Sequence, residues 1–237
     1  MNTGILYGIS VGTGDPELIT VKGLRILQQS NAIAFPSGIN NRPGIARSII
    51  SRWLESDKLL IPLDFPYLQE PKKLQQAWQA AAETVWSYLE RGMNVSFACL
   101  GDIGFYSTFT YLARTLKELH PDARIEYIPG VSSPMAISSV LQIPLTEEKD
   151  KLAVLPALYS VRELEAVLDW AETVVLLKVS SVYQSVWQIL EARNLLASSW
   201  IVEKATFSDQ KIYVNLQEYP NLQLSYFSVL LIKNSLA

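Results

Sequence analysis

Strand-like and helix-like segments alternate along almost the whole of this 237-residue chain. The strand-like runs are short and rich in β-branched residues, and apolar residues recur at helical spacing in the segments between them. In residues 70–90, the clearest helical segment, Leu74 and Trp78 lie on one expected apolar face. This alternation favours an α/β protein built around largely parallel sheets.

Both halves of the chain are expected to follow this pattern. In the first half we expect strands at 5–11, 32–35, 58–61, 94–99 and 124–128, and helices at 16–29, 43–54, 70–90, 107–118 and 133–141. In the second half we expect strands at 151–156, 173–179, 199–204, 212–215 and 225–232, and helices at 162–170 and 182–192. The last strand is expected at an edge or in an antiparallel pair.

The segment 144–150, P-L-T-E-E-K-D, is polar and opens on proline, which is typical of a linker. No internal repeat is visible on either side of it. We therefore expect an N-terminal α/β domain over 1–143, the linker 144–150, and a C-terminal α/β domain over 151–237.

The composition disfavours several classes of function. One cysteine, Cys99, and one histidine, His120, leave no internal disulfide and too few soft ligands for a zinc or iron site, so we expect no protein-bound metal. With 20 basic and 23 acidic residues the chain has no broad positive field, which disfavours a nucleic-acid partner. We interpret His120 as a loop residue.

No apolar run reaches the length of a membrane span. The residues after Met1 have the pattern of a strand and lack the basic and apolar regions of a signal peptide. We therefore expect no membrane partner and a cytoplasmic location.

Three turns in the first half share one design, namely a strand, then glycine beside a small or acidic residue, then a helix start. The first is 11–16, V-G-T-G-D-P, whose glycines permit positive φ and whose Asp15-Pro16 pair suits a helix start. Its spacing fits neither a dinucleotide fingerprint nor a phosphate-binding loop. A capping Asp before Pro suits any helix, so this turn by itself does not indicate a function.

The second turn, 100–108 or L-G-D-I-G-F-Y-S-T, follows an apolar strand. Gly101 and Gly104 keep the loop open, and Asp102 can accept a hydrogen bond from a ligand ammonium or ribose hydroxyl. In the alternative interpretation, Asp102 forms the turn and Ser107 caps the following helix. Two glycines around an acid exceed what a turn needs, which favours a role in ligand binding.

The third turn, 129–134 or P-G-V-S-S-P, has the serine and proline of another helix start. Its significance comes from its position. Ligands of open parallel sheets bind beyond the carboxyl ends of the strands, and all three turns follow strands at that side. The sequence therefore predicts a ligand site formed by the three turns together.

These turns resemble the signature loops of the tetrapyrrole methylases. The matching residues are V-G-T-G-D-P-E-L-I-T-V-K-G at 11–23, L-G-D-I-G-F-Y-S-T-F at 100–109 and P-G-V-S-S at 129–133. The resemblance covers essentially the full chain and implies a two-domain α/β enzyme, usually a homodimer, with S-adenosyl-L-methionine as co-substrate in the cleft between its domains. Segments 64–66, 106–109 and 177–179 most resemble the branch that methylates precorrin-2, or its cobalt complex, at C(20) in cobalamin biosynthesis.

The resemblance also implies which residues form the site. The contacts to the methionine and adenosine parts of the donor would fall on Leu100, Gly101, Asp102, Phe105, Ser132, Ser133, Val179 and Ala205, with Thr13 as a weaker candidate. The first loop, with Asp15, would line the trough for the tetrapyrrole. Since the acceptor carbon is electron-rich, methyl transfer needs positioning more than a protein nucleophile. Asp15 is a hypothetical base for the departing proton, with a helix cap as its alternative role.

Two positions depart from the family pattern. Ile103 stands where the family usually has proline, and we expect it to loosen the second turn. Pro36 stands where uroporphyrinogen methylases carry aspartate, which argues against the earlier siroheme-forming step. The carboxylates of precorrin-2 require local cations, for which Arg42, Arg47 and Lys22 are candidates, although each is more simply a surface charge.

Other assignments stay open. The chain can be a tetrapyrrole methylase acting at a different ring position, or a relative that methylates diphthamide precursors or ribosomal RNA, although the acidic balance counts against RNA. From a different class, it can be a non-catalytic adenosine-ligand sensor on the same fold. The sequence does not distinguish the metal-free from the cobalt-containing substrate.

Overall fold

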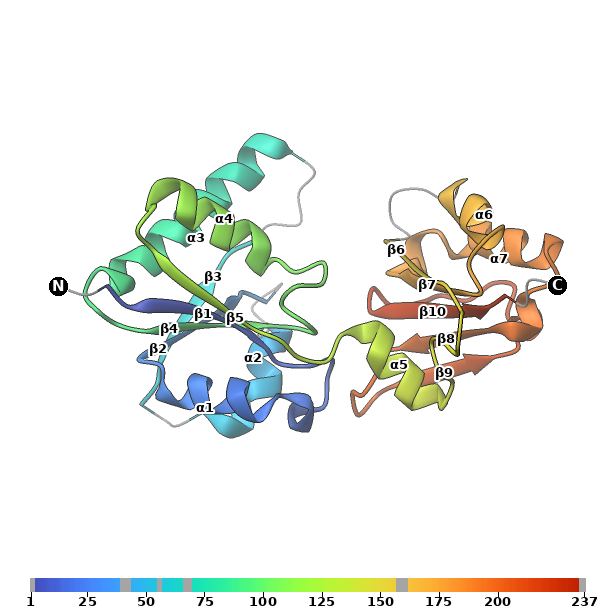
Figure 1. The fold of residues 1–237 in the computed structure, drawn as a ribbon, viewed down its shortest axis with the longest axis horizontal. Coiled ribbons are helices and arrows are strands. Elements are labelled where there is room, and N and C mark those ends of the chain that lie inside the picture. The colour runs from blue at the N-terminus through green and yellow to red at the C-terminus, as the bar shows by residue number, and fades with distance from the viewer. Residues whose placement is uncertain (1–2, 39–43, 55–56, 66–69, 157–161, 235–237) are drawn as a thin grey trace. The chain divides into compact units, whose positions relative to one another are not determined.

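The structure, a computed structural model, describes residues 3–38, 44–54, 57–65, 70–156 and 162–234. The chain divides into two compact units, Met1–Ser132 and Ser133–Ala237, and each unit contains a five-stranded sheet with helices packed on it (Figure 1). The α/β class is confirmed. Helix α5 (Ser133–Leu141) contacts β10 (Ser228–Lys233), so it belongs to the second unit. The linker over 144–150 stays a prediction.

The first unit has an all-parallel sheet in the order β3-β2-β4-β1-β5. Its strands are β1 (Ile5–Ser10), β2 (Ala32–Pro36), β3 (Leu59–Leu63), β4 (Val95–Cys99) and β5 (Arg124–Ile128). The central strand β4 is buried along its whole length, as expected for a parallel strand covered on both faces. Because all the strands run in one direction, their carboxyl ends lie at the same end of the sheet.

Four helices cover the two faces of this sheet. They are α1 (Val21–Gln29) and α2 (Ile45–Ile50) on one face, and α3 (Pro71–Leu89) and α4 (Phe109–Leu119) on the other (Figure 1). The core beneath α3 and α4 includes the fully buried Phe97 of β4. Ala81, Val85 and Leu89 of α3 are buried in the same core, so the apolar face predicted for residues 70–90 is confirmed.

The first two expected helices are shorter than predicted. A 3-10 helix at Pro16–Leu18 precedes α1, and the hydroxyl of Thr20 accepts a backbone N–H of the first turn of α1 at 3.1 Å. A side-chain cap at that point favours a new helix start over continuation of the first helix. The helix expected at 43–54, of which 43 lies outside the described residues, consists of α2 followed by a 3-10 helix at Ser51–Trp53.

The second unit has a mixed sheet in the order β6-β7-β10-β8-β9. Its other strands are β6 (Leu152–Pro156), β7 (Thr173–Leu177), β8 (Ser199–Glu203) and β9 (Lys211–Val214). The antiparallel pairing expected for the last strand, as the alternative to an edge position, is confirmed, and β10 lies between β7 and β8, away from either edge of the sheet. The physical reason is its run of five consecutive buried residues, 228–232, which suits a strand covered on both faces.

Helices also pack on the second sheet. Helices α6 (Arg162–Leu168) and α7 (Tyr183–Ala192) lie on one side, and α5 lies on the other (Figure 1). The core under α6 and α7 includes Leu176 of β7 and Leu230 of β10, which are both buried. Each unit thus has its own hydrophobic core, so each sheet end can be considered by itself.

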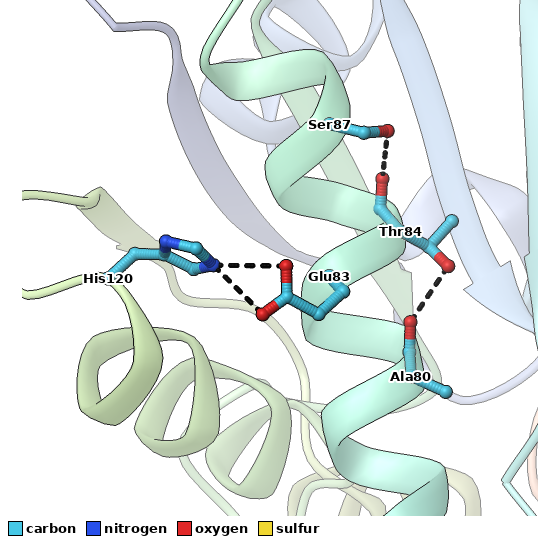
Figure 2. Close-up of polar contacts among 5 residues, drawn as sticks. All are labelled: Ala80, Glu83, Thr84, Ser87 and His120. Carbon is cyan, nitrogen blue, oxygen red and sulfur yellow. Dashed lines mark hydrogen bonds and ion pairs between the residues drawn. The ribbon is translucent and has the colours of Figure 1, made fainter.

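His120 follows α4 and ties that helix to α3. Its Nε2 atom lies 3.2 Å from both carboxylate oxygens of Glu83 (Figure 2), and its ring stacks on Trp86 with the ring centres 4.2 Å apart. The N–H of His120 also donates to the Leu116 carbonyl at the end of α4. His120 is therefore a structural residue beyond the helix end, in agreement with its prediction as a loop residue.

Candidate functional site

The carboxyl ends of β4, β1 and β5 are adjacent, and a glycine-containing turn follows each of them. We call residues 11–16, 100–108 and 129–132 of the first unit the turn cluster. The first two turns pair directly, since the Gly101 N–H donates to the Gly12 carbonyl at 2.7 Å. Both glycines have positive φ, of 78° and 74°, a conformation that costs other residues about 1–2 kcal/mol.

Asp102 joins the second turn to the third. Its Oδ1 accepts the Gly104 N–H at 2.9 Å, and its Oδ2 accepts the Gly130 N–H at 2.7 Å. Hydrogen bonds to a charged acceptor are stronger than neutral ones. The carboxylate therefore does what the turn-former interpretation predicted and, in addition, fixes a neighbouring turn.

Ser10, which sequence analysis missed, lies under this network. It is the last residue of β1 and is fully buried. Its Oγ accepts the Ile103 N–H at 2.8 Å and donates to the Ile128 carbonyl at 2.8 Å, with Oδ2 of Asp102 3.4 Å away. The available signal was a hydroxyl at the end of a strand in an otherwise apolar run, directly before the first glycine turn.

Ile103 does not loosen the second turn, contrary to the expectation. Its side chain is only 2% exposed and belongs to the core of the first unit. Its N–H, which a proline would lack, is paired with Ser10. The apolar side chain and the paired N–H both hold this turn in place.

The end of the second turn carries two aromatic residues and a helix cap. The rings of Phe105 and Tyr106 meet edge to face with their centres 4.9 Å apart. Tyr106 has a φ of 50° and is 57% exposed, which is an unusual conformation for a bulky residue. The hydroxyl of Ser107 accepts the Phe109 N–H at 3.0 Å at the start of α4, but the N-cap residue is Thr108, whose side chain makes no capping bond.

The single cysteine ends β4, directly before this turn. Burial is the largest cause that raises the pKa of the Cys99 thiol to about 11, and its Sγ lies 3.0 Å from Oγ of Ser107. The thiol is therefore protonated at neutral pH and is a poor nucleophile.

The first turn carries two of the predicted residues, Thr13 and Asp15. Oδ1 of Asp15 accepts the Glu17 N–H at 2.8 Å and begins the 3-10 helix, and Thr13 is 7% exposed. The capping alternative for Asp15 is thus present in the structure. A role in proton transfer remains a proposal.

The residues predicted on the third turn fall on both sides of the division between the units. Ser132 is the last residue of the first unit, and Ser133 is the first residue of α5 in the second. Both side chains are partly exposed. The first unit therefore brings together Thr13, Leu100, Gly101, Asp102, Phe105 and Ser132 at one end of its sheet.

The other two predicted residues lie at the ends of two strands of the second unit. Val179 follows β7 and Ala205 follows β8, and both are buried. Three non-glycine residues that are adjacent in sequence to Val179 or Ala205 have a left-handed backbone conformation, and we call them the left-handed sites. They are Lys178 (φ 57°), Lys204 (φ 50°) and Thr206 (φ 69°). Such residues cluster where surrounding structure imposes the conformation, which is common at ligand sites.

Glu203, the last residue of β8, is a second residue that sequence analysis missed, and its hydrogen bonds stabilise this end of the second sheet. It is 6% exposed, and its carboxylate accepts the Ser225 N–H at 2.6 Å and the Tyr213 hydroxyl at 2.9 Å. Burial opposes its ionisation, but these hydrogen bonds and the charge of Lys211 together lower the pKa of Glu203. The nearby Lys178 lies over the Tyr226 ring, 5.0 Å from its centre. The signal was an acid at the end of an apolar strand.

Of the three cations suggested for substrate carboxylates, the structure describes Lys22 and Arg47, which lie on different helices of the first unit, α1 and α2. Lys22 lines a polar pocket on the α1 side of the first sheet together with Arg25, opposite Glu126. Arg47 lies over the Phe35 ring, 5.7 Å from its centre. Arg42 lies outside the described residues.

The backbone at the turn cluster fits a close ligand. A Cβ built on Gly101 meets no heavy atom of the described residues within 4 Å, so this backbone borders open space. Its positive φ favours glycine even though there is room for a side chain. This combination suits a ligand that lies against the main chain.

Neither a metal cluster nor a membrane-spanning helix is found in the part of the chain that the structure describes. No group of three or more His, Cys, Asp or Glu residues is placed to hold a metal ion there. No helix in the same ranges is long and apolar enough to cross a membrane.

The fold and the turns agree with comparisons to known proteins. The chain is 30% identical to the precorrin-2 C(20)-methyltransferase of Sinorhizobium sp over 98% of its own length and 96% of the relative. It is 29% identical to the cobalt-precorrin-2 C(20)-methyltransferase of Salmonella typhimurium, over 97% of the chain and 96% of the relative.

A solved structure has the same fold. It is the uroporphyrin-III C-methyl transferase of Thermus thermophilus complexed with S-adenosyl homocysteine, which is 15% identical with a TM-score of 0.65, and 97% of each chain is covered. The family model of the tetrapyrrole (corrin/porphyrin) methylases matches residues 5–220. The chain therefore belongs to the tetrapyrrole methylases.

Proposed function

We propose that this protein transfers the methyl group of S-adenosyl-L-methionine to C(20) of precorrin-2 or cobalt-precorrin-2, in cobalamin biosynthesis. The observation that carries the proposal is the turn cluster, in which Asp102 joins two turns at the carboxyl ends of adjacent parallel strands. Ligands of parallel sheets bind at this position. Near-full-length similarity to C(20)-methyltransferases supports the choice of acceptor.

The proposed donor contacts are those that the family resemblance implies. Leu100, Gly101, Asp102, Phe105 and Ser132 of the first unit, with Ser133, Val179 and Ala205 of the second, would contact the methionine and adenosine parts, and Thr13 is a weaker contact. The open backbone at Gly101 supports this assignment. Bound there, the sulfonium would supply the methyl group.

The chain's own contribution to the reaction is chiefly positioning. Holding the donor and acceptor carbons in line and excluding water lowers much of the barrier to methyl transfer. The Cys99 thiol, protonated at neutral pH, is unsuited to nucleophilic catalysis. Asp15, whose Oδ1 accepts the Glu17 N–H, is the proposed acceptor of the proton that leaves C(20).

Three further properties are part of the proposal. We propose that the protein is a homodimer, because the family resemblance implies one. We also propose a cytoplasmic location, which suits a biosynthetic enzyme. The partners are small molecules, and the net charge of −3 disfavours nucleic acid. The cobalt of a cobalt-precorrin substrate would belong to the tetrapyrrole.

Donor binding is the first test. Isothermal titration of the protein with S-adenosylhomocysteine, with NAD as the control ligand, should give binding of the first and none of the second. Binding of NAD alone would contradict the assignment of the turn cluster, whose glycine spacing does not fit a dinucleotide.

The position of methylation is the second test. The protein is incubated with precorrin-2, with and without cobalt, and with methyl-labelled donor, and the label is located by carbon NMR. Label at C(20) is the expected result. Label at another carbon would favour a methylase of a different ring position, and donor binding without transfer to either substrate would favour a sensor.

A further inference from the structure

Ser10 joins all the strands that carry the turn cluster. It ends β1, its Oγ accepts the Ile103 N–H from the turn after β4, and it donates to the Ile128 carbonyl at the end of β5. The third turn also packs against it, since a Cβ on Gly130 would come within 2.5 Å of the Ser10 Cβ. This one buried residue therefore contacts three segments.

The Ile103 N–H depends on this hydroxyl. Ile103 is 2% exposed, and its backbone N–H has Ser10 as its hydrogen-bond acceptor in the described structure. A buried N–H without a partner is costly, whereas a proline at the same place would have no N–H to satisfy. The Ser10 hydroxyl thus satisfies the N–H of Ile103, whereas a proline in this turn would have no N–H to satisfy.

The pair lies next to the proposed donor contacts. Ile103 directly follows Gly101 and Asp102, and Oδ2 of Asp102 lies 3.4 Å from the Ser10 Oγ. Movement of the Ile103 backbone would displace the Asp102 carboxylate, which holds the Gly130 N–H. Ser10 itself is fully buried, so it cannot touch a ligand.

We propose that Ser10 is a positioning residue for the methyl donor, and that its hydroxyl acts through the Ile103 N–H to hold Gly101 and Asp102 in their binding conformation. The proposal rests on the proposed function, because it takes the second turn to be part of the donor site. It assigns the rigidity of the second turn to a residue that has no ligand contact.

The test is a double-mutant cycle with Ser10→Ala and Ile103→Pro in the full-length protein. In each of the four proteins the affinity for S-adenosylhomocysteine is measured by titration, and KM for the donor and kcat are measured with precorrin-2. The loss of the isoleucine side chain is common to both Ile103→Pro proteins, so it cancels in the cycle. Melting temperatures monitor folding.

We expect Ser10→Ala to weaken binding about tenfold in the native background, because it leaves a buried N–H unpaired. With Ile103→Pro already present, the same change should weaken binding by less than about threefold, since no N–H remains to be satisfied. KM for the donor should rise while kcat changes little. Equal losses in both backgrounds, or native affinity in the single Ser10→Ala protein, would overturn the proposal.

Two more variants separate positioning from stability. Ser30→Ala removes another buried hydroxyl of the first unit, one that donates to the Ile26 carbonyl at 2.9 Å beyond the end of α1. It should lower the melting temperature without changing donor affinity, and a tenfold loss of affinity there would count against a specific role of Ser10. Ser10→Cys keeps the packing with a weaker acceptor, so it replaces Ser10→Ala in the cycle if that protein does not fold.

Failure of this proposal differs from failure of the proposed function. If the native protein binds S-adenosylhomocysteine and Ser10→Ala binds equally well, only the positioning role is lost. If the native protein binds no S-adenosylhomocysteine, the donor site and the positioning role are both wrong.

Discussion

The turn cluster of the first unit and the left-handed sites of the second stand at the ends of their sheets, but they are built differently. In the first unit, Gly12 and Gly101 adopt positive φ without strain, although Tyr106 at the end of the second turn also has positive φ with a Cβ present. In the second, Lys178, Lys204 and Thr206 adopt it with a Cβ present. A buried or partly buried carboxylate supports each region, Asp102 in one and Glu203 in the other.

The difference teaches how strain is distributed. A glycine turn needs little support from its surroundings, so the hydrogen bonds of Asp102 can serve to align turns with one another. A lysine or threonine with left-handed backbone costs about 1–2 kcal/mol, and packing elsewhere must offset this. The first region should therefore lose function when its hydrogen bonds are removed, and the second should gain stability when its strain is relieved.

Removal of the Asp102 carboxylate should have the largest effect. Asp102→Ala leaves the Gly104 and Gly130 N–H groups without their acceptor and separates the second and third turns. We expect kcat/KM for methyl transfer to fall about 100-fold or more, since each charge-assisted bond contributes about 1.5–3 kcal/mol. Steady-state kinetics with precorrin-2 and S-adenosylmethionine measure this change.

The matched control is Asp57→Ala in the same unit, which removes an exposed carboxylate. It should keep native kinetics. An Asp102→Ala protein with native kcat/KM would show that the function of the turn cluster does not depend on this carboxylate. The claim that the first region loses function when its hydrogen bonds are removed would then be wrong.

Two glycines of the turn cluster should respond differently to a methyl group. Gly130→Ala places a Cβ 2.5 Å from the Ser10 Cβ, and overpacking of this kind costs about 2–3 kcal/mol of unfolding free energy. Gly101→Ala meets no described atom within 4 Å, so only its positive φ is penalised, by about 1–2 kcal/mol. Urea unfolding of both proteins measures the difference. A larger loss for Gly101→Ala would mean that backbone strain outweighs packing here.

Sequence reasoning predicted the first region better than the second for a physical reason. Glycine beside an acid at a strand end is visible in the sequence, so the sheet end and Gly101 with Asp102 could be predicted. Left-handed lysine and threonine have no such signature, because tertiary packing imposes their conformation. Ser10 was missed because its role depends on a hydrogen bond to Ile103, 93 residues away in sequence.

The limits of the fold prediction have similar causes. The spacing of apolar residues and the residue composition predicted the strands. Whether a strand is central in its sheet depends on the strands that pair with it, as the position of β10 between β7 and β8 demonstrates. The break before α1 depends on the Thr20 cap, a local signal that a continuous helical pattern concealed. Local chemistry predicted elements, and long-range contacts decided their neighbours.

The contribution of the Glu203 carboxylate to the free energy of unfolding can be tested by varying the pH. The folded protein lowers the pKa of Glu203 from its ordinary value of 4.5, so the ionised form stabilises the fold. This stabilisation is complete above pH 4.5 and is lost as the pH falls through the lower folded pKa. Glu203→Gln should cost about 1–2 kcal/mol at pH 7, and the difference from the native protein should shrink below about pH 4.

Denaturant unfolding of both proteins between pH 3 and 7 measures this prediction. Asp169→Asn, which alters an exposed ion pair with Arg193, is the control and should change stability by less than about 1 kcal/mol throughout. A pH-independent difference for Glu203→Gln would mean that the charge of Glu203 does not stabilise the strand end.

The smallest effect is expected at Thr206, and its sign is the informative result. Thr206→Gly removes a β-branched side chain from a φ of 69°, relieving about 1–2 kcal/mol of strain against about 0.5–1 kcal/mol of glycine entropy. We expect the free energy of unfolding to rise by about 0.5 kcal/mol and donor affinity to fall, because the segment beside Ala205 becomes less rigid. Thr84→Gly, within the regular helix α3, should instead lower stability by about 0.3–0.5 kcal/mol, because threonine is itself a weak helix former. If both substitutions destabilise the protein equally, the left-handed backbone at Thr206 is not strained. Strain at the left-handed sites then does not lower the stability of the second unit.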